Sequence, residues 1–401
     1  MLTRRFFVRG SALVVAGAGA MPAWLGRAAA ATEGKRKTLV AIFQRGAADG
    51  LSIVAPFGDK RYAELRPTIG VLAPGKQGNP GIDLDGFFAF HPQLDPLKPL
   101  WQKQQLAVVQ ATGSPDPSRS HFDAQDFMES GTPGAKGDGW LNRALPPPTP
   151  ETTPLRAIAM GAELPRTLRG DRSAIALGDM QHYKMNDDTA SILESMYGAS
   201  GDKQLAGAGK DAFAAMKMIQ SLTAGRYTPE NKAEYGGSEL GRSLQQVARL
   251  IKANAGVEAA FAEIGGWDHH QSEQQQLPQL LRQFGSALAG FCQDMGDRME
   301  DIVLVTMSEF GRTAQENGDN GTDHGHGSLM MVLGGPVRGG KVYGRWPGLE
   351  KEQLYEGRDL AVTTDFRAVL SELVSGHLGQ KDVAQVFPGY KCGEQLGLLR
   401  A

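Results

Sequence analysis

The chain has 401 residues, with 42 lysines and arginines, 44 aspartates and glutamates, and a formal net charge of −2 at pH 7. This near-neutral balance offers no strongly basic surface, so we expect no nucleic-acid partner. The two cysteines, Cys292 and Cys392, are too few for a disulfide framework or a thiolate metal site, although one bridge between them is allowed in an oxidising compartment.

The first 31 residues have the pattern of a twin-arginine signal peptide. Thr3, Arg4, Arg5 and Phe7 match a Ser/Thr-Arg-Arg-x-Phe core, and the apolar run at residues 11–23 is followed by small residues. This run is too short to span a bilayer, so we expect a cleaved signal rather than an anchor. A chance basic tail or an uncleaved anchor is the alternative interpretation.

Residues 32–401 are the expected mature chain, which is predicted to be periplasmic or otherwise exported by the twin-arginine pathway. Without the first 31 residues the chain loses four arginines and no acidic residue, which leaves 38 basic and 44 acidic side chains. No later stretch is apolar and long enough to predict a transmembrane segment. The twin-arginine route carries folded proteins, which favours a passenger that acquires a metal or cofactor before export.

Short apolar runs alternate with amphipathic patterns along the mature chain. The runs predict strands covered on both faces, as in a parallel sheet, at residues 38–43, 106–111, 257–264, 302–307 and 329–333. Helical periodicity is clear at residues 240–251 and 277–295. We therefore predict one α/β domain, with a linker at residues 141–154 and a helical insertion or cap at residues 181–235.

Polar and ionisable residues gather directly after the predicted strands, where an open parallel sheet places its ligand site. They lie at residues 44–52, 114–130, 265–270, 308–313 and 322–327. Five of the eight histidines are in these segments, together with aspartates and glutamates. Imidazole and carboxylate are ligands for zinc, manganese and similar divalent ions, so we predict a metal site; a hydrogen-bonded loop is the alternative for each histidine segment.

Other polar residues in these segments are candidates for binding or attacking an anionic group. Arg45 and Arg312 are placed to grip an anion, although structural salt bridges explain them nearly as well. Ser120 is a candidate nucleophile only because it lies beside His121 and Asp123.

The order of the motifs RGAADGLS, SHFDAQDFMESG, GGWDHH, SEFGRT, TDHGHG and TTDFRAVLSELVSGHLG resembles a large bacterial family of twin-arginine-exported proteins, domain of unknown function 1501. The resemblance runs from about Thr38 to the C-terminus. That family is in turn similar to the alkaline phosphatase and sulfatase superfamily, which implies a three-layer α/β/α sandwich with a largely parallel central sheet.

The superfamily resemblance also implies roles for individual residues. Its metal ligands and nucleophile would correspond, in chain order, to Asp49, Ser120, Asp268 with His270, Glu309, and His324 or His326. The resemblance implies one ion on Asp268, His270 and one of the late histidines, and a second ion on Asp49 and Glu309. The ions would be zinc, manganese or calcium.

Two departures from the superfamily pattern bear on the chemistry. Pro115 stands where the sulfatase signature needs a Cys or Ser, so formylglycine-type sulfatase chemistry is not expected. Phe310 follows Glu309 where the superfamily has a second metal ligand, so one ligand is missing or is supplied by His121, His269 or Asp323.

These observations lead to a predicted metal-dependent hydrolase acting on a small-molecule or polymer-borne anionic ester, such as a phosphate or sulfate ester. The alternative is a non-catalytic exported binding or assembly protein that keeps the fold. A redox protein is disfavoured, because the sequence has no Gly-x-Gly-x-x-Gly after a strand and no cysteine cluster.

Overall fold

A computed structural model describes residues 36–134, 137–178, 203–223 and 225–400. The predicted signal peptide and residues 181–202 of the predicted insertion lie outside the described residues. The described remainder of that insertion contains the helix α9 (Lys203–Thr223). Within the described part of the chain, no helix combines the length and apolar character needed to cross a membrane.

The centre of the fold is a mixed, mostly parallel sheet of nine described strands. The continuous path runs β11 (Lys341–Tyr343), β5 (Leu106–Gly113), β10 (Ser328–Gly334), β9 (Ile302–Met307), β1 (Thr38–Gln44), β8 (Ala259–Ile264), β6 (Ala157–Met160) and β7 (Ile175–Leu177), and β12 (Thr364–Asp365) pairs with β5. All five predicted strands are present. Of these, β1, β5, β9 and β10 are buried along their whole length, as their continuous apolar runs predict.

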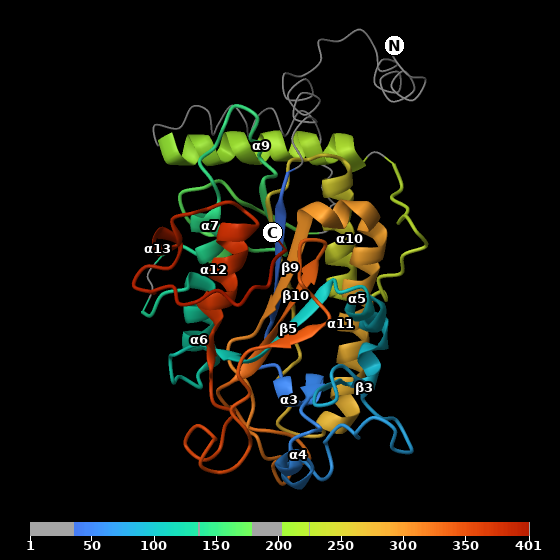
Figure 1. The fold of residues 1–401 in the computed structure, drawn as a ribbon. Coiled ribbons are helices and arrows are strands. Elements are labelled where there is room, and N and C mark those ends of the chain that lie inside the picture. Colours follow the sequence, from blue (N-terminus) through green and yellow to red (C-terminus); the bar gives the residue numbers. More distant parts are fainter. Residues whose placement is uncertain (1–35, 135–136, 179–202, 224, 401) are drawn as a thin grey trace. The chain divides into compact units, whose positions relative to one another are not determined.

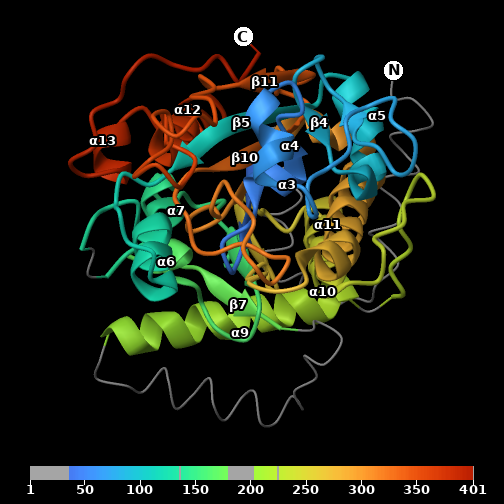
Figure 2. The ribbon, with the colours of Figure 1, turned by 90° about the horizontal axis from the view of Figure 1, so that it is seen from below.

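Helices cover both faces of this sheet. On one side lie α6 (His121–Ser130), α7 (Trp140–Ala144), α12 (Phe366–Gly376) and α13 (Val383–Val386), and on the other lie α5 (Lys98–Gln102), α10 (Glu239–Lys252) and α11 (Glu273–Met295) (Figures 1 and 2). The helices predicted at residues 240–251 and 277–295 are α10 and α11, which pack against each other. The predicted three-layer α/β arrangement is therefore confirmed.

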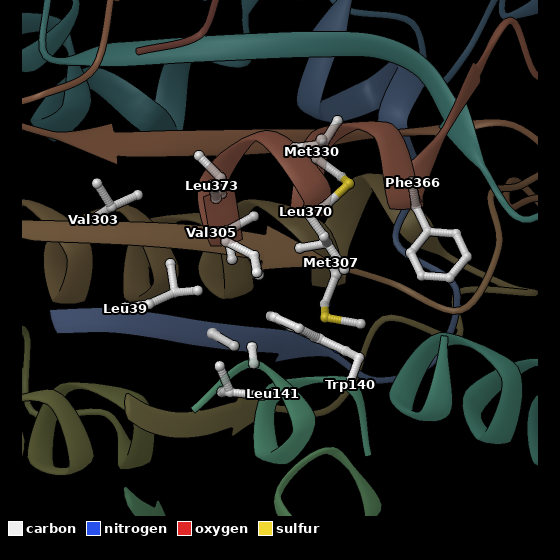
Figure 3. Close-up of a cluster of buried hydrophobic side chains, with 14 of the residues drawn as sticks. Leu39, Trp140, Leu141, Val303, Val305, Met307, Met330, Phe366, Leu370 and Leu373 are labelled. Carbon is white, nitrogen blue, oxygen red and sulfur yellow. The ribbon is translucent and has the colours of Figure 1, made fainter. Parts of the chain in front are cut away.

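The core between the sheet and α12 and α7 consists of apolar side chains from both layers. Val303 and Val305 of β9 and Met330 of β10 face Leu370 and Leu373 of α12 (Figure 3). The predicted linker at residues 141–154 is wrong at its start, because residues 140–144 form α7 and both Trp140 and Leu141 are buried. These apolar side chains are more stable in the core than in water, and the exposed linker begins only after Leu145.

Strand β10 runs antiparallel to both of its neighbours, β5 and β9. Its beginning therefore lies at the same edge of the sheet as the carboxyl ends of β1, β5, β8 and β9. The loop before β10, which contains His324, is brought to this edge together with the loops that follow the parallel strands. A smaller antiparallel sheet of β2 (Val54–Ala55), β4 (Ala89–Phe90) and β3 (Ile82–Asp83), with α3 (Gly50–Ile53) and α4 (Lys60–Leu65), follows β1.

Candidate metal centre

Three histidine side chains and one aspartate converge at the carboxyl edge of the sheet. The Nε2 atoms of His121 and His324 are 3.0 Å apart, and those of His270 and His324 are 3.1 Å apart. Asp268 Oδ1 lies 3.2 Å from His324 Nε2 and 3.1 Å from His270 Nε2. Its other oxygen, Oδ2, lies 3.5 Å from His121 Nε2. His121, Asp268 and His324 form a group that could hold a metal ion.

Each of these three histidines has its other ring nitrogen, Nδ1, bonded to an oxygen acceptor. His121 Nδ1 is 2.8 Å from Glu309 Oε1, His270 Nδ1 is 3.2 Å from Asp323 Oδ1, and His324 Nδ1 is 3.0 Å from the main-chain oxygen of Arg119. Since carboxylates and carbonyls accept hydrogen bonds, the proton of each neutral imidazole lies on Nδ1. The three Nε2 atoms then carry no proton. Those of His121 and His270 each lie close to that of His324.

The elements that carry these residues explain why they meet. His121 is the first residue of α6, which begins after the N-cap Ser120 and ends at Gly131 in the left-handed conformation. Asp268 and His270 follow β8, and His324 precedes β10. Gly325 lets the loop before β10 pass close to Arg312, because a Cβ atom at Gly325 would be 2.3 Å from the main-chain carbon of Arg312.

Glu309 is a buried carboxylate that anchors His121. Its Oε1 accepts hydrogen bonds from the main-chain nitrogen of Gly46 and from Gln125 Nε2, and its Oε2 accepts one from Ser308 Oγ. Burial alone would raise the pKa of Glu309, but these hydrogen bonds and the one from His121 outweigh it and lower the pKa. In return, the hydrogen bond to ionised Glu309 raises the pKa of His121.

Asp268 is held by the buried guanidinium of Arg312. Arg312 Nη1 lies 2.6 Å from Asp268 Oδ1, and Arg312 Nε donates to Thr322 Oγ1. Partial burial would raise the pKa of Asp268, but the hydrogen bond and charge of Arg312 outweigh it and lower the pKa. Burial lowers the pKa of His324, and so do the charge that His121 carries when protonated and the charge of Arg312; the lowered pKa favours the neutral, ligating form of His324.

The remaining predicted site residues have other partners in the structure. Arg45 forms structural salt bridges with Glu129 and Glu263. His326 is buried and stacks on the ring of Tyr355. Ser120 lies directly before His121 as the N-cap of α6, and its side chain makes no capping hydrogen bond.

Asp49, predicted as a ligand of a second ion, forms a buried ion pair with Arg66. Both of its oxygens accept from the Arg66 guanidinium, Oδ2 also accepts from Ser52 Oγ, and Oδ1 accepts from the main-chain nitrogen of Leu51. Burial would raise the pKa of Asp49, but the charge and hydrogen bonds of Arg66 lower it. The sequence analysis did not single out Arg66, which has no motif around it and is recognisable only from its buried position.

Glu273 lies beside this pair as a neutral carboxyl group. Burial and the negative charge of Asp49 raise its pKa to about 8, and its Oε2 accepts a hydrogen bond from Thr322 Oγ1. Thr322 also contacts Arg312, so a chain of hydrogen bonds links Glu273 to Asp268. The sequence analysis did not identify Glu273 either, because a single glutamate at the start of a helix carries no distinguishing pattern.

Replacing Glu273 by glutamine is expected to flatten part of the pH dependence of stability. Between an ordinary carboxyl pKa of 4.5 and about 8, the folded chain holds a proton here that the unfolded chain has released. The free energy of unfolding therefore falls as pH rises through this window. Urea unfolding at pH 6 and pH 9 should show that the wild type loses more stability than Glu273→Gln; parallel losses would contradict the neutral carboxyl.

The two cysteines are not bridged in the structure. Cys292 is buried and free, and Cys392 is exposed and free. Burial raises the pKa of the Cys292 thiol to about 12, so this group is an inert part of the core. The disulfide that the sequence allowed is therefore not formed here.

The fold and this cluster define the class of the protein: an α/β protein with a histidine and carboxylate centre at the carboxyl edge of a mostly parallel sheet. The chain belongs to the family described as "Protein of unknown function (DUF1501)", which matches residues 36–382. The family membership predicted from the motifs is confirmed. Among proteins of curated function, none matches the sequence of this chain.

Several solved structures are similar to this chain at low sequence identity. A protein of the alkaline phosphatase superfamily from Vibrio parahaemolyticus aligns at 10% identity with a TM-score of 0.33, over 75% of this chain and 60% of its own. The lipoteichoic acid synthase LtaP from Listeria monocytogenes aligns at 9% identity with a TM-score of 0.33, over 74% and 65% respectively. The PsFucS1 sulfatase from Pseudoalteromonas aligns at 10% identity with a TM-score of 0.39, over 95% and 78%.

This chain thus spans less than two thirds of the length of the first two of these proteins. With every one of these TM-scores below 0.5, the likenesses assign no activity to the chain. The chemistry must be argued from the centre itself.

Proposed function

We propose that this chain is an exported metal-dependent hydrolase of anionic esters, with a divalent ion held by His121, Asp268 and His324 and with His270 beside them. One observation carries the proposal: three imidazoles have their Nδ1 atoms bonded to oxygen acceptors, and their Nε2 atoms meet beside one carboxylate. Histidines that bind metals usually have an oxygen partner of this kind on the second ring nitrogen. Two bare nitrogens at 3.0 Å repel each other unless a proton or a metal ion lies between them.

The spacing of the donor atoms supports a metal ion. Ligand atoms at 2.0–2.1 Å from a tetrahedral ion are about 3.3 Å apart, from the usual zinc bond lengths. The donor atoms of His121, Asp268 and His324, which form the compact group, are 3.0 to 3.5 Å apart. A set of imidazoles and one carboxylate suits zinc or manganese, whereas calcium prefers oxygen ligands throughout.

We further propose one ion per chain. The resemblance implied a second ion on Asp49 and Glu309, but both oxygens of Asp49 are engaged by Arg66. The oxygens of Glu309 are engaged by His121, Gln125, Gly46 and Ser308. Binding a second ion there would break two buried hydrogen-bond networks.

When bound, the ion would supply Lewis-acid activation of the ester. Arg312 holds one oxygen of Asp268 and so fixes the orientation of that carboxylate. Glu309 holds His121 in the tautomer with a bare Nε2. Ser120, one residue before His121, is the candidate nucleophile, and its hydroxyl is not used in a helix cap.

The test uses the full chain, produced in a host with an active twin-arginine route and purified from the exported fraction. Metal analysis should find about one zinc or manganese ion per chain, and a chelator-sensitive activity should appear on a panel of phosphate mono- and diesters, phosphonates and sulfates. A chain that binds no divalent ion even after incubation with zinc and manganese would overturn the proposal. Recovery of the unprocessed chain from the cytoplasm alone would contradict export.

The same experiment separates catalysis from a non-catalytic role. A chain that binds the ion but hydrolyses no ester in the panel would favour the binding or assembly protein. In that case an Asp268→Ala/His270→Ala double variant should leave the biological role intact, whereas the hydrolase proposal requires the role to be lost.

A further inference from the structure

His324 has a different kind of anchor from the other two histidines. The acceptor for its Nδ1 is the main-chain oxygen of Arg119, at 3.0 Å, whereas His121 and His270 are anchored by side-chain carboxylates. Residues 114–120 form no helix or strand, so this carbonyl is placed only as firmly as the loop that carries it. Its position must therefore be fixed by contacts of the loop with the rest of the fold.

The side chain of Arg119 supplies such a contact. Its Nε and Nη2 atoms lie 3.1 and 2.6 Å from Asp359 Oδ2, and Nη2 also lies 2.7 Å from Glu356 Oε2. Asp359 is fully buried, and its main chain pairs with Thr313 and Tyr355 in isolated bridges. The loop that anchors His324 is thus bound to a fully buried carboxylate.

Asp359 also has a connection to the main chain of His324. Arg358 Nε lies 3.0 Å from Asp359 Oδ1, and the guanidinium of Arg358 donates a hydrogen bond to the main-chain oxygen of His324. The same carboxylate therefore contacts both Arg119, whose oxygen is the acceptor of the His324 ring, and Arg358, which donates to the main-chain oxygen of His324. None of Arg119, Arg358 and Asp359 is among the side chains that converge at the centre.

We propose that the Arg119–Asp359 ion pair positions His324 and fixes the tautomer in which its Nε2 is free to bind the ion. Because a carbonyl only accepts hydrogen bonds, a correctly placed Arg119 oxygen keeps the proton on Nδ1. If the loop shifts, the ring can turn or carry its proton on Nε2, and one ligand is lost. This inference rests on the proposed metal function and identifies Arg119 and Asp359 as positioning residues, not catalytic ones.

The experiment compares Arg119→Met and Asp359→Asn with the wild type in the purified full chain. Zinc affinity, measured by competition with a chromophoric chelator, should fall about 10- to 100-fold, which is the usual effect of removing an anchor of a metal-binding histidine. The absorption bands of the Co²⁺-loaded Arg119→Met variant should resemble those of His324→Ala. Arg119→Lys, which keeps the charge, should recover part of the affinity.

Arg367→Met is the matched control. Arg367 contacts Asp365 through Nε at 3.0 Å and Nη2 at 2.6 Å, much as Arg119 contacts Asp359, but Arg367 makes no described contact with the three histidines. Its zinc affinity and Co²⁺ spectrum should match those of the wild type. If both Arg119→Met and Asp359→Asn had the zinc affinity and Co²⁺ spectrum of the wild type, the positioning role would be overturned but the metal site would not. If the wild type itself bound no metal, the proposed function would be overturned.

Discussion

Replacing His324 by alanine is expected to reduce zinc affinity at least about 100-fold and to abolish any metal-dependent hydrolysis. His324 Nε2 is the central donor of the cluster, since it lies within 3.2 Å of His121 Nε2, His270 Nε2 and Asp268 Oδ1. Its removal takes away the imidazole nitrogen that lies close to both of the other imidazoles. Removing the anchor of a metal-binding histidine usually lowers metal affinity about 10- to 100-fold. Removing His324 should lower it further, because a ligand itself is lost. Equilibrium dialysis with metal analysis measures the effect.

His326→Ala is the control for this prediction. His326 lies two residues away on the same loop, is buried, and was an equally good candidate in the sequence. In the structure its ring stacks on Tyr355 and faces a different set of neighbours. His326→Ala should keep one ion per chain. If His326→Ala lost the ion and His324→Ala kept it, the ligand would be His326.

Replacing Arg66 by methionine is expected to lower the free energy of unfolding by about 3–5 kcal/mol, because it leaves the Asp49 carboxylate buried without its partner. Every N–H of this guanidinium has an acceptor: Asp49, Ser52 and the main-chain oxygens of Thr313 and Ala314. The side chain is fully buried, so water cannot replace these partners. Urea unfolding of the metal-free chain measures the loss.

The metal content of Arg66→Met distinguishes a structural Asp49 from a ligand. If Asp49 is structural, the variant that still folds binds one ion per chain, as the wild type is expected to do. If Asp49 is released from Arg66 and is a ligand, the ratio rises towards two. Arg61→Met is the control on α4, which ends directly before Arg66, because Arg61 pairs with exposed Glu64 and Glu350, and such surface pairs contribute at most about 1 kcal/mol.

The layered fold could be predicted because its signal is local. A fully buried strand needs a continuous apolar run, and the runs at β1, β5, β8, β9 and β10 supply it. The short strands β6 and β7 were missed, since four or three residues are too few for a clear pattern. The start of the linker was predicted wrongly for a related reason. The proline residues after Leu145 indicated a linker, but residues 140–144 form a one-turn helix whose apolar residues complete the core.

Within the candidate centre, the sequence pointed to candidate donor residues but not to their partners. The motifs placed His121, Asp268, His270 and either His324 or His326 among the candidates, because histidine and aspartate after strands are distinctive.

The supporting residues Arg66, Arg119, Glu273 and Asp359 were not selected. Arg66 bonds to the main chain of a residue 248 positions away, and Arg119 and Asp359 pair across 240 positions. The partner of Glu273 at Thr322 is 49 positions away, and its raised pKa comes from burial and from Asp49. No local pattern reveals contacts over such distances along the chain.

By itself, the sequence determined the alternation of strands and helices, the family, and the segments that supply imidazole and carboxylate groups. Only the tertiary structure decided which of these groups meet. The antiparallel direction of β10 brings His324 to the edge where His121 and His270 lie, and buried arginines engage Asp49 and one oxygen of Asp268. The physical reason is that residue type and hydrophobic period are local properties, whereas the partner of a buried charge is chosen by how distant segments pack together.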